Sequence, residues 1–472
     1  MDLRLKGLRT IVMLGTAFIA GVTTGPVTAL IAMYGGIAFS AQTASDEISD
    51  RTDTYWSLAL FGDVFERVRL DYVDLVSDKS LIEDALDGML TGLDPHSGYM
   101  NAEEFQEMQA EDAGEFGGVG IEVTLDNGFL RVISAIDGSP AARAGIKAGD
   151  LITTLNGKTV QGLALNDLIA HMRGALNSKI TLTIKRTGSD QPLQVTMRPE
   201  VIHVAVVKQR LEPDKIGYVR LTEFTEKADA ALKLSVKSLK QQAGGKLKAL
   251  VLDLRNNPGG LLDQAVAISS DFVERGEIVS IRARHPEDGQ RWDSKGKDII
   301  GGIPLVVLIN GGSASSSEIV AAALQDHRRA VLVGARSFGK GSVQTVIPLS
   351  NNGALRLTTA RYYTPSGRSI QGLGIKPDVP VAETSKEEPQ FGPEREADLN
   401  HVLENEGGTP DTGAEPRTDL PPIATEIPSK PPKGFPEFDP SKPDNTDFQL
   451  QQALVVARAM STKQNHVTAN GG

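Results

Sequence analysis

Between residues 201 and 381, apolar strand patterns alternate with amphipathic helix patterns, and this alternation restricts the fold more than any other feature. Helix patterns at 228–242 and after position 315 separate the strand patterns. Strands that alternate with helices are typical of an α/β domain with a mainly parallel sheet. The predicted strands of this α/β body occupy residues 216–221, 249–254, 304–309, 330–333, 343–349 and 354–360.

Within this body, Ser315 and Lys340 are the residues most indicative of chemistry. A serine hydroxyl is a weak nucleophile until a base accepts its proton, and lysine can be that base only if burial keeps its amine neutral. Ser315 opens a predicted helix, where free N–H groups favour a developing negative charge. Its neighbours Ser313, Ser316 and Ser317 are rival nucleophiles, and Glu318 is expected to cap the helix. The pattern predicts hydrolysis of an acyl bond by a Ser-Lys dyad.

Several separated motifs give the chain a family resemblance. They are Leu93-Asp94-Pro95-His96-Ser97, Phe116-Gly117-Gly118-Val119-Gly120-Ile121, Asp253-Leu254-Arg255-Asn256-Asn257-Pro258-Gly259-Gly260 and the two segments that contain Ser315 and Lys340. From about residue 58 to residue 378 the chain resembles the carboxy-terminal processing peptidases, which are tail-specific serine proteases with a PDZ domain. The resemblance implies a crotonase/Clp-protease-like α/β body with an inserted, β-rich PDZ domain. It also implies peptide-bond hydrolysis through an acyl-enzyme, without a cofactor.

The resemblance assigns roles to individual residues. Ser315 would be the nucleophile, Lys340 the base and Gln344 a supporting residue that orients the lysine amine. If a strand begins near Gly341, Lys340 and Gln344 would share one face of it. The N–H of Ser316 and one from the glycine turn would form the oxyanion hole, with Gly259 preferred and Gly260 in reserve. An ordinary strand-to-helix turn is the alternative for the two glycines.

Residues 113–200 are predicted to form the PDZ domain, with a strand at 130–136, a hairpin turn at Asn156-Gly157 and a helix at 164–173. Such a domain adds a substrate peptide as a strand and captures its terminal carboxylate. The predicted substrate contacts are Gly118, Val119, Gly120 and Ile121 in the carboxylate loop, with Leu168 and Met172 in the groove. Arg173 could couple this domain to the protease, although a helix C-terminus favours arginine in any case.

The regions outside these two domains predict location and partners. Arg4, Lys6 and Arg9 precede an uncharged apolar stretch, so residues 1–45 are expected to be a signal peptide or membrane anchor that exports the rest to the periplasmic side of the envelope. Residues 46–112 show helical periodicity. Residues 382–472 are rich in proline and acids and predict a disordered tail that ends in an amphipathic helix. That helix could fold back or bind a sister subunit.

Composition limits the ligands. The net charge of −11 disfavours nucleic acid, and the absence of cysteine excludes disulfides and thiolate metal sites. The histidines lack metal-ligand spacing, so we expect no metal site. Expected partners are protein substrates with apolar free C-termini, an activator or adaptor protein, and further copies of the chain bound through the terminal helices.

Two other functions are compatible with parts of this pattern. The chain could be a PDZ adaptor on an inactive protease body, but an adaptor would not need a buried amine at Lys340. It could also be a chymotrypsin-like protease with an appended PDZ domain. The domain order and the lack of a Gly-Asp-Ser-Gly segment disfavour that reading.

Overall fold

The computed structural model describes residues 53–469, apart from 127, 137, 164, 174–177, 187, 189–190, 386–394, 406–416 and 437–445. The predicted signal or anchor at 1–45 lies outside the described residues. Within the residues that are described, no helix combines the length and apolar character needed to cross a bilayer. The chain divides into two units, Met1–Ala85 and Leu86–Gly472.

The described part of the first unit is helical. A helix covers residues 53–71, and α3 (Asp78–Thr91) begins in this unit. Apolar side chains of the first helix are at least half exposed, namely Tyr55, Trp56, Leu58, Leu60, Phe61 and Val64.

The second unit is built around a six-stranded sheet in the order β10-β11-β12-β15-β16-β19, which is parallel from β11 onward. Its strands are β10 (Val207–Glu212), β11 (Ile216–Leu221), β12 (Ala249–Asp253), β15 (Leu305–Ile309), β16 (Ala330–Gly334) and β19 (Val379–Pro380). The strands β12, β15 and β16 are buried throughout, as expected for a parallel sheet covered on both faces. The strands β11, β12, β15 and β16 match predicted strands, whereas β10, which pairs antiparallel with β11, was not predicted.

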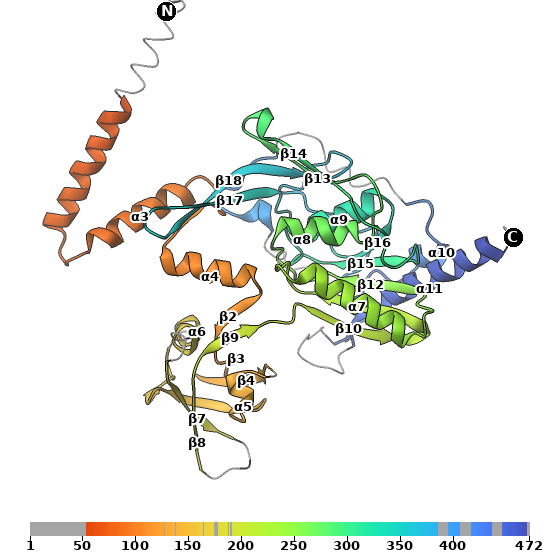
Figure 1. Ribbon diagram of the computed structural model, residues 1–472, viewed down its shortest axis with the longest axis horizontal. Coiled ribbons are helices and arrows are strands. Elements are labelled where there is room, and N and C mark those ends of the chain that lie inside the picture. Colours follow the sequence, from red (N-terminus) through yellow and green to blue (C-terminus); the bar gives the residue numbers. More distant parts are fainter. Residues whose placement is uncertain are drawn as a thin grey trace, which may run out of the picture. The chain divides into compact units, whose positions relative to one another are not determined.

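Helices cover both faces of this sheet (Figure 1). On one face, α7 (Ala228–Gln242), α8 (Leu262–Ser270) and α9 (Ser316–Asp326) pack against alternate strand residues such as Leu252 and Val307. On the other face, α10 (Pro422–Thr425) and α11 (Phe448–Ala469) pack against the intervening residues such as Val251 and Leu308.

Within the described residues after 382, the predicted terminal helix is present as α11, but the prediction of disorder is wrong for packed segments before it, in which Glu396 and Ala424 are buried. Ala453 and Val456 of α11 are fully buried against the sheet, and Glu396 is 1% exposed. The physical reason is that both faces of a parallel sheet must be covered, and α7, α8 and α9 cover only one of them. The terminal helix folds back onto its own chain, so its buried face is not available to a sister subunit.

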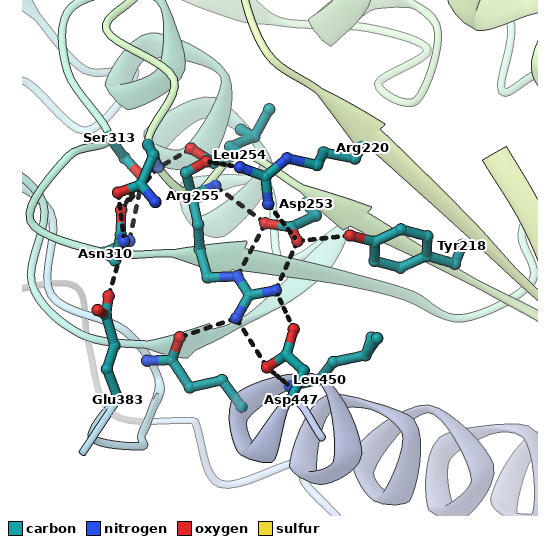
Figure 2. A network of polar contacts seen from close by, with 12 residues as sticks. Tyr218, Arg220, Asp253, Leu254, Arg255, Asn310, Ser313, Glu383, Asp447 and Leu450 are labelled. Carbon is teal, nitrogen blue, oxygen red and sulfur yellow. Dashed lines mark hydrogen bonds and ion pairs between the residues drawn. The ribbon is translucent and has the colours of Figure 1, made fainter. Parts of the chain in front are cut away.

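A buried polar network fastens α11 to the sheet (Figure 2). Arg255, two residues after the end of β12, donates to Asp253 at 2.6 Å and to Asp447, just before α11, at 2.6 Å. Tyr218 and Arg220 of β11 also donate to Asp253. Asp253 is fully buried, and Arg255 and Asp447 are 3% and 7% exposed. Although burial opposes it, the pKa of Asp253 lies below its usual range because Arg255 and Arg220 stabilise the charged carboxylate.

A second, antiparallel sheet carries the segment after Lys340. Its strands run in the order β1-β18-β13-β14, with β17 paired to β18. They are β1 (Gly98–Met100), β13 (Glu277–Ala283), β14 (Gln290–Asp293), β17 (Ser342–Pro348) and β18 (Ala354–Tyr363). Lys340 lies two residues before β17, and the motif around Asp94 ends at Ser97, directly before β1.

The β-rich domain predicted as PDZ has its own core. Its sheet runs β3-β4-β5-β7-β8, with β6 on β5, and helices α5 and α6 pack with it. These elements are β3 (Ile121–Asp126), β4 (Phe129–Ala135), α5 (Pro140–Arg143), β5 (Leu151–Leu155), β6 (Lys158–Thr159), α6 (Leu165–Arg173), β7 (Ile180–Lys185) and β8 (Leu193–Met197). The chain enters and leaves it through the paired strands β2 (Glu115–Gly118) and β9 (Glu200–His203), after helix α4 (Ala102–Asp112).

Candidate active site

Ser315 occupies a strained position at the N-terminus of α9. Its φ of 51° and ψ of −113° lie outside the regions that L-residues normally populate. Such conformations persist only where surrounding contacts enforce them, and they gather at functional sites. Here the Ser315 N–H donates to Glu318 Oε2 at 2.9 Å, one turn into the helix. Glu318 therefore has the capping role that the sequence predicts.

The rival serines are all engaged in hydrogen bonds to main-chain carbonyl groups. Ser313 Oγ donates to Leu254 at 2.8 Å, Ser316 Oγ to Gly260 at 2.8 Å and Ser317 Oγ to Asn257 at 2.9 Å. All three are fully buried, whereas Ser315 is partly exposed. Among the described residues, no hydrogen bond runs from the Ser315 hydroxyl to a main-chain carbonyl, in contrast to the other three serines. It is the one serine of the run whose oxygen is open to a substrate.

Glu318 connects the serine and lysine segments. In addition to Ser315, its carboxylate accepts hydrogen bonds from Ser337 Oγ at 2.5 Å, Gly339 N at 2.8 Å and Lys340 N at 2.9 Å. The main chains of Ser315 and Lys340 thus meet at the same oxygen, Oε2. Burial raises the pKa of Glu318 to about 7, while the four hydrogen bonds favour its charged form. Sequence reasoning found only the cap, because the contacts with 337–340 depend on the fold.

Lys340 lies in an environment that favours the neutral amine. The residue is half-buried, and burial lowers the pKa of its amine below the usual value of 10.5. Among nearby charges, Glu396 acts most strongly in the opposite direction. Between the described residues Ser315 and Lys340, no hydrogen bond joins Oγ to Nζ. Hydrogen bonds of a catalytic base often form only when substrate binds.

Gln344 was predicted to contact the Lys340 amine, but its side chain contacts other residues. Its amide nitrogen donates to Ser342 Oγ at 3.0 Å and Thr358 Oγ1 at 3.1 Å, and no hydrogen bond links it to Lys340 in the described structure. A β-bulge between Val343 and Gln344 interrupts the regular pairing of β17 with β18. Such a bulge breaks the simple alternation of faces from which the shared face with Lys340 was predicted.

The Asp94 motif supports the same region. Asp94 is 3% exposed and accepts hydrogen bonds from Ser97 Oγ at 2.6 Å and Thr358 Oγ1 at 2.9 Å. Thr358 in turn accepts from Gln344. The sequence analysis assigned no role to this motif. In the structure, Asp94 holds Thr358 of β18, the strand that pairs with β17.

The glycine turn lies directly against Ser315. A Cβ atom added at Gly259, which has φ of 111°, would lie 2.8 Å from Ser315 Cβ and 3.1 Å from Ser316 N. The Gly259 N–H donates to Asn257 Oδ1 at 2.9 Å. Gly260, with φ of 132°, packs against the Phe224 carbonyl. Both positions require glycine, because a Cβ atom at Gly259 would collide with Ser315 and one at Gly260 with the Phe224 carbonyl. The N–H of Gly259 is already bound to Asn257.

The predicted peptide groove coincides with a cavity of about 510 Å³. Gly118, Val119, Gly120, Ile121 and Met172 line it, together with Ile169. Leu168 is 1% exposed and belongs to the core of the domain instead. Arg173 lies 3.5 Å from Glu107 of α4, which is its ion pair in the structure.

Comparison with known proteins supplies independent information. A model described as peptidase family S41 matches residues 215–381, a PDZ domain model matches 131–186, and a model described as activating protease CtpB N-terminal domain matches 27–104. A carboxy-terminal-processing protease of Bartonella bacilliformis is 54% identical over 334 residues, which span 71% of this chain and 77% of that protein.

More distant matches have similar descriptions. A probable CtpA-like serine protease of Staphylococcus aureus is 37% identical over 320 residues, covering 67% of this chain and 63% of that protein. Among solved structures, a photosystem II D1 C-terminal processing protease is 31% identical, with a TM-score of 0.42, and the match covers 69% of this chain and 92% of that one.

Proposed function

Because the chain belongs to peptidase family S41 and is a PDZ-containing serine peptidase of the carboxy-terminal processing type, we propose that it is an exported endopeptidase with a Ser-Lys mechanism. The observation that carries this proposal is the state of the four serines near α9. Ser313, Ser316 and Ser317 are buried and hydrogen-bonded, and only Ser315 offers a hydroxyl to substrate. Glu318 brings the main chain of Ser315 to that of Lys340.

In the proposed reaction, Ser315 Oγ attacks the peptide carbonyl while the neutral amine of Lys340 accepts its proton. The resulting ammonium group then protonates the departing amine, which leaves an ester on Ser315. Lys340 next removes a proton from water, whose oxygen attacks the ester; the bond to Ser315 Oγ then breaks, the ammonium returns the proton to Oγ, and the second product leaves as a carboxylic acid. Substrate binding would bring Lys340 Nζ within hydrogen-bond distance of Ser315 Oγ, and Gln344 is retained as a supporting residue beside the base.

The oxyanion hole is proposed to consist of the main-chain N–H groups of Ser316 and one glycine. Ser316 is the first residue of α9, so its N–H is among those that a helix leaves unpaired. Sequence reasoning preferred Gly259 over Gly260. The hydrogen bond from Gly259 N to Asn257 favours Gly260 in this role, with Gly259 providing the close approach to Ser315.

Substrate selection is proposed to depend on the PDZ domain, taken as residues 113–200. The N–H groups of the 118–121 loop would bind a terminal carboxylate, and Met172 would contact an apolar terminal side chain. Arg173, through Glu107 of α4, offers a route by which occupancy of the groove could reach the rest of the chain. Further copies of the chain could associate through the exposed apolar residues of helix 53–71.

Export is proposed from the sequence of residues 1–45, with either cleavage or retention of that segment. An exported peptidase with this groove would act on proteins with free apolar C-termini on the periplasmic side of the envelope. An activating partner is compatible with the lack of a hydrogen bond between Lys340 Nζ and Ser315 Oγ among the described residues.

The test uses two synthetic peptides with the same apolar C-terminal sequence, one ending in a free carboxylate and one amidated. We expect the full-length protein to cleave the free peptide with a KM about tenfold lower, because one charge-assisted interaction is worth about that factor. Ser315→Ala should cleave neither peptide, whereas the exposed Ser350→Ala control should behave as the parent. Equal KM values would show that the groove does not bind the terminus. Cleavage by Ser315→Ala would reject the proposed nucleophile.

A further inference from the structure

Glu396 is a buried carboxylate that no step of the proposed mechanism uses. It begins the short 3-10 helix η3 (Glu396–Asp398), beyond the 215–381 match to the peptidase model. Only 1% of the residue is exposed. A charged group is expensive to bury unless it is paired and hydrogen-bonded, so its partners indicate why it lies there.

The contacts of Glu396 lead to the lysine segment. His96 Nε2 lies 3.0 Å from Oε1 and 2.9 Å from Oε2, and Gln371 Nε2 donates to Oε1 at 2.9 Å. The fully buried Gln371 accepts, through its Oε1, the N–H of Gly341 at 3.0 Å. The Glu396 N–H donates to the Phe338 carbonyl at 3.2 Å. Glu396 therefore holds the chain two residues before Lys340 directly, and one residue after it through Gln371.

Four charged groups act on the Lys340 amine, and each comes from a different element. Glu396 of η3, Glu318 of α9 and Asp94 before β1 favour the ammonium form, and Arg356 of β18 opposes it. Arg356 is itself held by a hydrogen bond to the His96 carbonyl. Glu396 contacts His96, and its charge acts on the Lys340 amine. Of the three carboxylates near the base, it contributes most to retaining a proton on Lys340.

We propose that Glu396 is a positioning residue for Lys340, which fixes the backbone on both sides of the base and sets the charge around its amine. This inference rests on the proposed role of Lys340. In this proposal, the chain after residue 382 positions the base through Glu396, and it also covers one face of the sheet.

The test compares Glu396→Gln with Asp398→Asn, which removes the same charge from an exposed residue of the same short helix. In the full-length protein, kcat/KM for the free peptide is measured against pH. Loss of the Glu396 charge should lower the pKa of Lys340, so the rising part of the pH profile should move to lower pH by about one unit. Asp398→Asn should leave it in place. An unmoved profile in a folded Glu396→Gln protein would overturn the proposal.

A second variant tests positioning without removing the charge. Gln371→Met has a similar volume and keeps the Glu396 carboxylate, but it breaks the connection to Gly341. We expect kcat to fall about tenfold or more with KM unchanged, because the base is displaced while peptide binding is not. An unchanged kcat would contradict the positioning role, including in the case that Glu396→Gln does not fold.

Lys340→Ala, measured in parallel, separates the two proposals. If that variant keeps the parent's activity, the Ser-Lys mechanism itself fails, and the inference about Glu396 fails with it. If Lys340→Ala is inactive while Glu396→Gln has the parent's pH profile, the mechanism stands and only the role of Glu396 is rejected.

Discussion

Replacing Lys340 with alanine is expected to lower peptide cleavage by about a thousand-fold or more while the protein stays folded. In the proposed mechanism the Lys340 amine accepts the proton of Ser315, whereas the Glu318 carboxylate is occupied by the four hydrogen bonds that hold the two segments together. The measurement is kcat/KM on the free peptide, with circular dichroism as the check on folding. The exposed Lys295→Ala variant is the matched control and should retain the parent's activity.

The same role predicts the pH dependence of the parent enzyme. Burial lowers the pKa of Lys340 from 10.5, and only the deprotonated amine can act as a base. Activity should therefore rise with pH through neutral and mildly alkaline conditions, as the fraction of neutral amine increases. A Lys340→Ala protein with activity near that of the parent, or a parent whose rate falls over this range, would be incompatible with lysine as the base.

Replacing Asp447 with alanine is expected to destabilise the second unit by about 3 kcal/mol. The change takes one carboxylate away from Arg255, which is 3% exposed, while Asp253 continues to pair with both Arg255 and Arg220. It also removes the ion pair between Arg255 and the residue just before α11, and leaves the Arg255 hydrogen bond to Gln449 of α11. The free energy of unfolding is obtained from urea titration followed by the fluorescence of Trp292, which lies in β14.

Arg458→Ala is the control for that experiment. It breaks the ion pair of α11 with Asp214, in which the side chains are 41% and 58% exposed. A surface pair of this kind contributes at most about 1 kcal/mol. If Asp447→Ala unfolds no more easily than Arg458→Ala, the buried network does not fasten α11 as described.

The fold class was predictable because its signal is local. Apolar strands alternating with amphipathic helices identify an α/β body, and the PDZ domain has turn and helix signals of its own. The family match and the fold confirm both, together with the assignment as a serine peptidase. The terminal helix of the second layer was predicted, with folding back as one alternative, but the packed segments between Ala382 and α11 were missed because their composition is that of a flexible tail. Only the requirement to cover both faces of a parallel sheet could have indicated them.

The candidate site was predictable to a different degree at each residue. Ser315 and Lys340 follow from chemistry and resemblance, and the hydrogen bonds of the other serines support the choice of Ser315. Glu318 was assigned only a local role, because its contacts with 337–340 join segments about twenty residues apart in sequence. The contacts of Gln344 with Ser342 and Thr358 lie at a β-bulge. Glu396 contacts Gln371 from a segment whose composition is typical of a flexible tail. Neither could be read from spacing.

The most direct test of the account is to identify the residue that an alkyl fluorophosphonate modifies in the full-length protein. The reagent reacts with an activated serine, and peptide mass mapping locates the adduct. We predict one phosphonyl group on Ser315, with labelling and loss of cleavage advancing together, and little labelling in Lys340→Ala. Modification of a different serine, or full cleavage activity after Ser315 is completely labelled, would contradict the Ser-Lys mechanism.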